Sequence, residues 1–269
     1  EFDGTGLDLS GPVISYTNLG KGISEPSRNF TAVAISDASS VNTTAGTKPR
    51  VYYKKSTDAN DLTGWVYVEA NGSTSPFDFT IDHTLLSGGG VSEGDVIQYF
   101  VVAQDIATTP NVGINSGSFA ASPASVDLTG AAFPIGGTIN SYTIVSELSG
   151  TKTVGTGGDY TTLTAADGFF AAVNANVISG NITVNIISDI TETGVTALNQ
   201  WDESGAGNYT ITIQPDGTTE RLLNSVSASV LVNLNGADRL IFDGRFSGSG
   251  KYLRVRNTNT GYATFKFTN

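Results

Sequence analysis

The stretch VGTGGDYTTLTAADGFFAAV, from Val154 to Val173, sets a glycine-rich turn directly before apolar residues with helical spacing. Such a turn could cradle a phosphate at the start of a helix. The dinucleotide-binding pattern G-x-G-x-x-G is incomplete, because Gly155 and Gly157 are followed by Tyr160 at the third glycine position. A P-loop needs Lys and then Ser or Thr, where Asp159 and Tyr160 stand, and a carboxylate repels phosphate. The stretch therefore predicts no nucleotide site.

The same stretch predicts a short amphipathic helix that stops near Asn174. Its apolar side chains fall at helical spacing: Leu163, Ala166, Phe169, Phe170 and Val173. Thr161 or Thr162 can cap its N-terminus. Gly168 costs about 1 kcal/mol relative to alanine inside a helix. Burial of the phenylalanine face must therefore hold this helix in place.

Short strands rich in β-branched and aromatic residues follow the predicted helix, separated by Gly, Asn and Asp. They are Ile182–Ser188, Tyr209–Pro215, Val230–Leu234, Arg239–Gly244, Tyr252–Asn257 and Tyr262–Asn269. No second helix separates them, which argues against a βαβ sheet. A recurrence of about 20 to 30 residues is typical of the coils of a parallel β-helix. A helix laid over the first coil would cover its apolar stack and its free strand edge.

The residues VGTGGDYTTLTAADGFFAAVNAN and GNITVNIISDITETG resemble the N-terminal cap and first coil of the pectin-lyase-like right-handed β-helix family. LVNLNGADRLIFDGR and YLRVRNTNTGYATFKFTN are similar to later coils of that family. The resemblance covers about residues 154–269. Polysaccharide lyases and hydrolases of the family carry their acidic and basic groups along the middle coils. The resemblance therefore implies that any catalytic coils lie beyond Asn269.

Seven strand-like segments with alternating apolar residues precede this region. They are Val13–Thr17, Asn29–Asp37, Arg50–Ser56, Gly64–Ala70, Phe77–His83, Asp95–Asp105 and Ser141–Val145. This spacing predicts an antiparallel β-sandwich of immunoglobulin or fibronectin III type, with the long apolar segment Asp95–Asp105 at its centre. The region between residues 105 and 140 is rich in Ala, Ser, Gly and Pro, and it predicts a contact loop or a flexible insertion.

GPVISYT, AVAISDASSV, PRVYYKKSTD and GDVIQYFVVAQD resemble an immunoglobulin- or fibronectin-like module of large exported proteins of the Bacteroidetes. That resemblance implies type IX secretion and an internal fragment of a longer surface protein. We expect an all-β chain with a linker at residues 1–11 and the sandwich at 12–146. The cap and first coils of the β-helix follow at 147–269, with the segment ELSGTK, residues 147–152, as the connection.

The composition restricts the class of partner. The 269 residues include 14 Lys and Arg against 25 Asp and Glu, a net charge of −11, which argues against nucleic acid and anionic membranes. The chain contains no cysteine, so disulfides and thiol catalysis are excluded. No apolar run is long enough to span a bilayer. Because methionine is also absent at residue 1, we expect a mature, exported protein at the cell surface or outside the cell.

Two loops of the first domain are candidates for binding calcium. Asp37 and Asp105 each end a strand, and with Asn111 they could supply hard oxygen ligands to a structural Ca²⁺. The alternative is that both aspartates cap turns by accepting backbone hydrogen bonds. The segment STDANDLTG departs from a calcium-loop pattern at Leu62 and Thr63. His83 is the single histidine, and a packing or surface role at a strand end is favoured over a catalytic triad.

No residue is assigned to catalysis. Glycosidases need two carboxylates about 5 to 10 Å apart. The acidic residues of the second half are Asp189 with Glu192, Asp202 with Glu203, and Asp238 with Asp243, and all lie in turn-like or strand-flanking positions. The rings of Trp65, Trp201 and Tyr209 are candidates for stacking on a sugar, with core packing as the alternative.

These observations predict a non-catalytic structural or adhesive fragment of a cell-surface protein. Its expected partners are a polysaccharide or cell-surface glycan and further domains of the same parent chain. Two alternatives remain open: a carbohydrate-binding module, and the N-terminal portion of a polysaccharide lyase or glycoside hydrolase of the pectin-lyase-like class.

Overall fold

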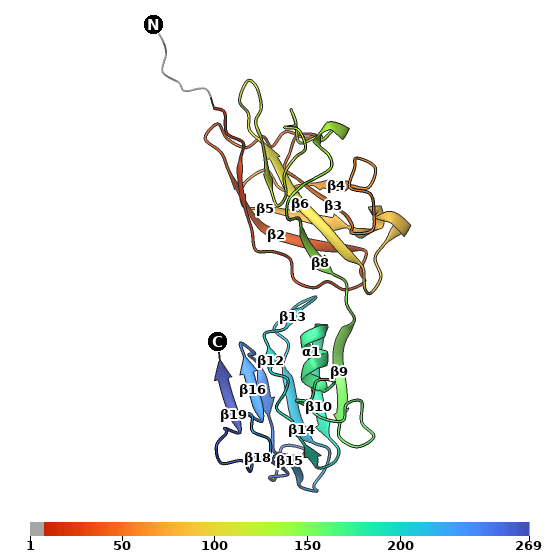
Figure 1. The fold of residues 1–269 in the computed structure, drawn as a ribbon, viewed down its shortest axis with the longest axis vertical. Helices are drawn as coiled ribbons and strands as arrows, with labels where there is room; N and C mark the ends of the chain where they lie inside the picture. The colour runs from red at the N-terminus through yellow and green to blue at the C-terminus, as the bar shows by residue number, and fades with distance from the viewer. Residues whose placement is uncertain (1–7, 269) are drawn as a thin grey trace. The chain divides into compact units, whose positions relative to one another are not determined.

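The computed structural model describes residues 8–268, and the chain divides into two compact units, Glu1–Ile144 and Val145–Asn269 (Figure 1). The all-β prediction is confirmed, since 41% of the chain is strand and 6% is helical. No helix in the described part of the chain has the length and apolar character needed to cross a bilayer.

The first unit contains two antiparallel sheets. One sheet has the order β1 (Val13–Ser15), β2 (Ser27–Ser36), β5 (Phe77–Asp82). The other has the order β4 (Val66–Glu69), β3 (Arg50–Lys55), β6 (Val96–Gln104), β7 (Val112–Asn115), with β8 (Asn140–Thr143) also paired to β6. Three short 3₁₀ turns are η1 (His83–Leu85), η2 (Ser87–Gly89) and η3 (Gly130–Ala132). The seven predicted strands are present, and β7 is additional.

Buried side chains of both sheets form one core in the first unit. On β5, Phe77, Phe79 and Ile81 are buried while the residues between them are more exposed, as the alternation predicted. The ring of Phe30 on β2 meets that of Tyr99 on β6 edge to face at 5.6 Å. The two sheets therefore face each other across this core. The finer assignment to the immunoglobulin or fibronectin III type stays a prediction.

Strand β6 is central, as its apolar sequence predicted, because it pairs with β3, β7 and β8. Its outward side chains Phe100 and Val102 join a second cluster with Tyr52 and Trp65. The cover over that cluster comes from Val126, Leu128, Ala132, Phe133 and Ile135, which are all buried. Residues 106–139 are therefore packed on the first unit, so the expectation of a flexible insertion was wrong, while the expectation of a contact loop stays a prediction. A strand that is apolar on both faces needs cover on both faces, and this segment supplies the second one.

The second unit is a β-solenoid of about four turns, which confirms the predicted stack of parallel coils. One parallel sheet contains β9 (Glu147–Val154), β10 (Val177–Ile186), β14 (Ile211–Pro215) and β17 (Leu240–Phe242), with β13 (Asp202–Glu203) also on β10. The second contains β11 (Ile190–Thr191), β15 (Arg221–Ser225) and β18 (Leu253–Asn257). The third contains β12 (Leu198–Asn199), β16 (Val232–Asn235) and β19 (Phe265–Thr268). Every pairing among these strands is parallel.

The segment ELSGTK is not a connection, and this expectation was wrong. It belongs to β9, which pairs in parallel with β10 from Glu147↔Val177 onward. Leu148 of the segment and Val154 at the end of β9 are buried in the solenoid core, so β9 contributes both a ladder of hydrogen bonds and apolar contacts. The solenoid therefore begins at β9, before the glycine-rich turn.

Helix α1 (Phe169–Ala175) starts later than the apolar spacing predicted. Gly168 stands at its N-cap position without a side-chain cap, and a Cβ there would lie 2.8 Å from the Leu163 carbonyl oxygen. The backbone N–H groups of Leu163 and Thr164 donate instead to the Glu192 carboxylate, which holds this segment in a turn. Phe169, Phe170 and Val173 are fully buried in the solenoid core, as predicted for the phenylalanine face.

Candidate functional site

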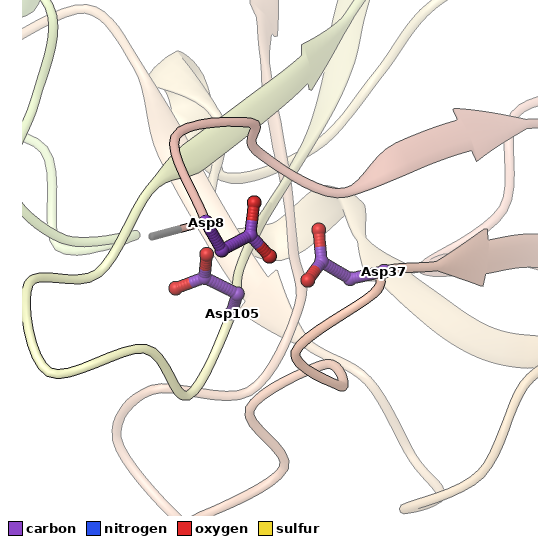
Figure 2. A group of neighbouring side chains, drawn as sticks. All are labelled: Asp8, Asp37 and Asp105. Atoms are coloured by element: carbon purple, nitrogen blue, oxygen red, sulfur yellow. The ribbon is translucent and has the colours of Figure 1, made fainter. Parts of the chain in front are cut away.

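Three aspartates from distant parts of the first unit converge at one end of its sheets. Asp37 follows β2, Asp105 follows β6, and Asp8 lies ahead of β1. One carboxylate oxygen from each lies within 4.8 Å of the others, and Figure 2 shows the carboxylates of Asp8 and Asp37 facing each other with Asp105 beside Asp8. Asp105 is fully buried, while Asp8 and Asp37 are partly exposed. We call these three residues the acidic pole.

Turn geometry explains how these carboxylates are held. Asp37 Oδ1 accepts the backbone N–H of Ser39 at 2.8 Å. The Ser39 hydroxyl donates to Asp8 Oδ2 at 2.6 Å, which links the first two aspartates. Asp105 Oδ1 accepts the backbone N–H of Asn111 at 2.9 Å. The aspartates therefore cap turns, and the same turns bring their remaining oxygens together.

Asn111 lies beside the acidic pole, but it acts as a donor there. Its amide nitrogen lies 2.7 Å from Asp105 Oδ2 and 3.1 Å from the Asp8 carbonyl oxygen. In this arrangement the Asn111 amide group positions Asp105. The sequence reasoning missed Asp8, because residues 1–11 were assigned to a linker. The Asp-x-Ser turn, in which the Ser10 N–H donates to Asp8 Oδ1, is the local signal that could have identified it.

Two carboxylates of the acidic pole have shifted pKa values. Burial, together with the nearby carboxylates of Asp8 and Asp105, raises the pKa of Asp37. Hydrogen bonds from the Ser39 hydroxyl and the Ser10 N–H lower the pKa of Asp8. A cavity of about 330 Å³ adjoins Asp37 and is lined largely by hydroxyl side chains of Ser36, Ser40, Thr43, Ser73, Thr74 and Ser75. Hard oxygen donors at this density suit Ca²⁺.

The rings predicted to stack on sugars are mostly inside the protein. Trp65 is buried against Phe100, with its indole nitrogen 3.0 Å from Asn60 Oδ1. Trp201 is buried in the solenoid core, and its indole nitrogen lies 3.1 Å from Glu203 Oε1. Tyr209 is partly buried and packs against the same core. Neither indole presents a free face to a ligand in this structure.

Three acidic residues of the solenoid, Asp189, Glu192 and Glu203, link adjacent coils. Glu192 is buried and accepts the N–H groups of Leu163 and Thr164 at 2.7 and 2.8 Å, and the Thr164 hydroxyl at 2.6 Å. Glu203 joins Arg239 of the next coil in an ion pair at 2.7 Å. The others form local or cross-coil links: Asp189 to the Leu222 N–H, Asp243 to Arg245, and Asp238 to Arg239.

Other candidate groups are also used structurally. His83 is fully buried, with Nδ1 2.7 Å from the Glu25 carbonyl oxygen and Nε2 2.8 Å from the Tyr142 hydroxyl, so its predicted packing role is confirmed. A carbonyl accepts only, so Nδ1 carries the proton and Nε2 accepts from tyrosine. In the loop that departs from a calcium pattern, the Lys54 ammonium donates to three carbonyls, those of Lys55, Ser56 and Asp58.

The glycine-rich turn is closed by its own hydrogen bonds. The Gly155 N–H donates to the Tyr160 carbonyl, and the Gly158 N–H donates to the Gly155 carbonyl. Asp159 accepts the N–H and hydroxyl of Thr153 at 2.7 and 2.9 Å. These amides are therefore engaged within the turn. No protein-family model matches the chain, and no curated protein or solved structure matches it.

Proposed function

We propose that this chain is a non-catalytic structural and adhesive portion of a large exported cell-surface protein. In this proposal an immunoglobulin- or fibronectin III-like module precedes the helix-capped first coils of a right-handed, pectin-lyase-like β-helix. The observation that carries the proposal is that Glu192 and Glu203, two of the candidate acidic residues of the solenoid, are engaged in linking adjacent coils. Such an arrangement favours a rigid spacer that displays other modules and binds a cell-surface glycan.

Turnover assays separate this proposal from its alternative, the N-terminal portion of a polysaccharide lyase or glycoside hydrolase. The full chain is incubated with a panel of uronate and neutral polysaccharides, and unsaturated products and new reducing ends are measured. A structural role predicts no turnover on any of them. Turnover by this chain would refute the structural role and support the enzyme.

Affinity electrophoresis through gels that contain each polysaccharide tests the adhesive component. Slower migration in a gel that contains one of the polysaccharides supports glycan binding. Unchanged mobility in all of the gels refutes glycan binding. Tyr209→Ala tests the one predicted ring that is partly exposed, with the exposed Tyr262→Ala as a control on a different coil. Weaker retardation of the first variant alone would assign Tyr209 to the binding surface.

We propose in addition that the acidic pole binds a structural Ca²⁺. The support is the convergence of three carboxylates from separate segments, with Asp8 joining the predicted Asp37 and Asp105. Ca²⁺ takes carboxylate and carbonyl oxygens in flexible geometries. Burial and the neighbouring carboxylates of Asp8 and Asp105 raise the pKa of Asp37, and a bound cation would offset both effects. The bound ion would tie the strand ends after β2 and β6 to the segment ahead of β1.

Thermal unfolding in calcium and in EDTA tests this site. Binding at a free calcium concentration 100 times the dissociation constant stabilises the folded state by about 2.7 kcal/mol. We expect Asp37→Asn to abolish the calcium-dependent rise in melting temperature of the first unit. Glu93→Gln, which removes an exposed carboxylate elsewhere in that unit, should preserve it. Equal melting temperatures of the first unit in calcium and in EDTA would refute the calcium site.

A further inference from the structure

The cavity of about 330 Å³ beside Asp37 lies in the first unit, at the end of the sheet that contains β2 and β5. One wall is formed by residues 35–43, at and after the end of β2, and the other by residues 73–75, which lead into β5. The pairing Val33↔Phe77 brings these two segments to the same end of the sheet. We call this cavity the hydroxyl pocket. Its volume lies in the range of small-molecule pockets, which is about 300–1,000 Å³.

The walls of the hydroxyl pocket carry hydroxyl groups that have no partner among the described residues. Within residues 8–268, five lining residues have hydroxyls that form no hydrogen bond: Ser36, Ser40, Thr43, Ser73 and Thr74. The apolar part of the lining comes from Val41 and from Ile35 and Phe77, which are each 2% exposed. A hydroxyl both donates and accepts hydrogen bonds. The pocket therefore combines free hydroxyls with hydrocarbon, the same two surfaces that a sugar ring presents.

The pocket has the charge of a site for neutral ligands. Asp37 is the one ionisable residue among its described lining residues, which include no Lys or Arg. The carboxylates of Asp8 and Asp105 lie beside Asp37 and add negative charge. A carboxylate accepts strong hydrogen bonds from hydroxyl groups, whereas it repels uronates, sulfates and phosphates. An uncharged sugar therefore fits this lining better than an acidic one.

Hydrogen bonds to the backbone fix both walls of the hydroxyl pocket. The Ile35 N–H donates to the Ser75 hydroxyl oxygen at 2.9 Å, which ties β2 to the loop before β5. The Asn42 N–H donates to the Gln104 carbonyl oxygen at 2.8 Å, which holds the segment after β2 against the end of β6. Groups that are fixed in place before binding lose less conformational entropy when a ligand arrives. The pocket is therefore organised in advance for a ligand.

We propose that the hydroxyl pocket binds a short stretch of a neutral glycan. This inference rests on the glycan-binding part of the proposed function, and it adds the place of binding and the class of sugar. The free serine and threonine hydroxyls exchange hydrogen bonds with the sugar hydroxyls, and Asp37 accepts a further one. Ile35 and Phe77 contact the C–H face of the ring. Binding then belongs to the first unit, while the solenoid acts as the spacer.

Affinity electrophoresis in EDTA tests the hydroxyl pocket without dependence on the calcium site. The gels contain dextran, galactomannan, xylan or polygalacturonate. We expect slower migration of the full chain in at least one of the three neutral gels and unchanged migration in polygalacturonate. Unchanged mobility in every gel would refute glycan binding itself, and this inference with it. Retardation by polygalacturonate alone would overturn the assignment to neutral sugars and leave glycan binding in place.

Isosteric variants locate the site. Thr43→Val and Thr74→Val each remove one hydroxyl and keep the shape of the side chain, so each should weaken binding about three- to tenfold. The double variant should weaken binding further. Thr31→Val alters an exposed threonine of the same unit that does not line the pocket, and it should leave binding unchanged. Equal retardation of the double variant and the unaltered chain would overturn the pocket, whereas glycan binding at another place, such as Tyr209, would stand.

Amide chemical shifts of the unaltered chain provide a test that remains valid if a variant unfolds. The full chain is titrated with oligosaccharides prepared from the polysaccharide that retards it. We expect the shift changes to concentrate at residues 35–43 and 73–75. Changes confined to the solenoid, residues 145–268, would overturn the pocket and place glycan binding on the second unit.

Discussion

Replacing Glu192 by alanine should destabilise the solenoid more than any exposed carboxylate substitution. Glu192 is buried, and its two oxygens accept three hydrogen bonds from Leu163 and Thr164, which are both fully buried. These bonds join the turn before α1 to the segment after β11. Glu192→Ala leaves two buried N–H groups without an acceptor, while the Thr164 hydroxyl keeps a contact with the Gly194 N–H.

The expected magnitude comes from those two amides. A buried donor left unsatisfied costs about 1–3 kcal/mol, and the two together about 2–6 kcal/mol. Removal of a buried charge offsets part of this cost, so we expect about 3 kcal/mol. With a urea dependence of about 1.5 kcal/mol/M, the unfolding midpoint of the second unit falls by about 2 M. Glu192→Gln keeps one acceptor oxygen and should lose about half as much.

The distribution of tryptophan makes this measurement specific. The chain has two tryptophans, Trp65 in the first unit and Trp201 in the second. In a Trp65→Phe background, fluorescence therefore reports unfolding of the solenoid alone, through exposure of the buried Trp201. Urea titrations of this background with and without each Glu192 variant give the change in free energy.

Glu220→Ala is the matched control. It removes the same charge from the same unit, but Glu220 is exposed and contacts Arg254 at 3.1 Å. An exposed ion pair of this type contributes about 0–1 kcal/mol. If Glu192→Ala and Glu220→Ala unfold at the same urea concentration, the buried hydrogen bonds do not carry the assigned stability.

Three further perturbations have defined outcomes. Burial lowers the pKa of His83, so the folded first unit holds the neutral ring and loses stability as pH falls below about 6.5 toward that lowered pKa. The urea midpoint of this unit should therefore fall with pH in that range. An equally steep fall in the His83→Gln variant would contradict this prediction. Arg50→Ala breaks the 2.8 Å link to Asp127 and should expose the 106–139 segment to limited proteolysis, whereas unchanged cleavage would show that apolar contacts suffice. Gly168→Ala should destabilise the second unit in spite of alanine's helix propensity, because the added methyl meets the Leu163 carbonyl; a raised midpoint in urea would refute the steric argument.

Regular patterns were the predictable part of this fold. The alternation of Phe77, Phe79 and Ile81 depends only on the two-residue repeat of a strand, so one segment is enough to reveal it. The solenoid was predictable because its coils repeat similar short strands, as in the register Ile182↔Ile211 and Ile211↔Leu240. Repetition supplies several observations of the same local pattern.

Features that depend on a partner far along the chain were not predictable. The segment of β9 has no alternation of its own, and its strand conformation is fixed by pairing with β10. The turn before α1 is held by a hydrogen bond from the Thr164 N–H to the Glu192 carboxylate, 28 residues further along the chain. In the acidic pole, Asp37 and Asp105 were recognisable as strand-end residues, but Asp8 reaches them through Ser39. The residues around each of these positions do not by themselves predict which distant residue they contact.

The order of the solenoid pairings has a consequence for how this unit is made. Each inter-coil pairing from β10 onward joins residues a few tens of positions apart, from Ile182↔Ile211 to Val232↔Phe265. These strands therefore pair with strands of a neighbouring coil and not with strands at the opposite end of the unit. Short sequence separation lowers the entropy of closing each contact, and a linear stack can nucleate once and grow. As the chain emerges from the ribosome, each coil finds its template already formed by the one before it. Synthesis and folding can then advance together, one coil at a time.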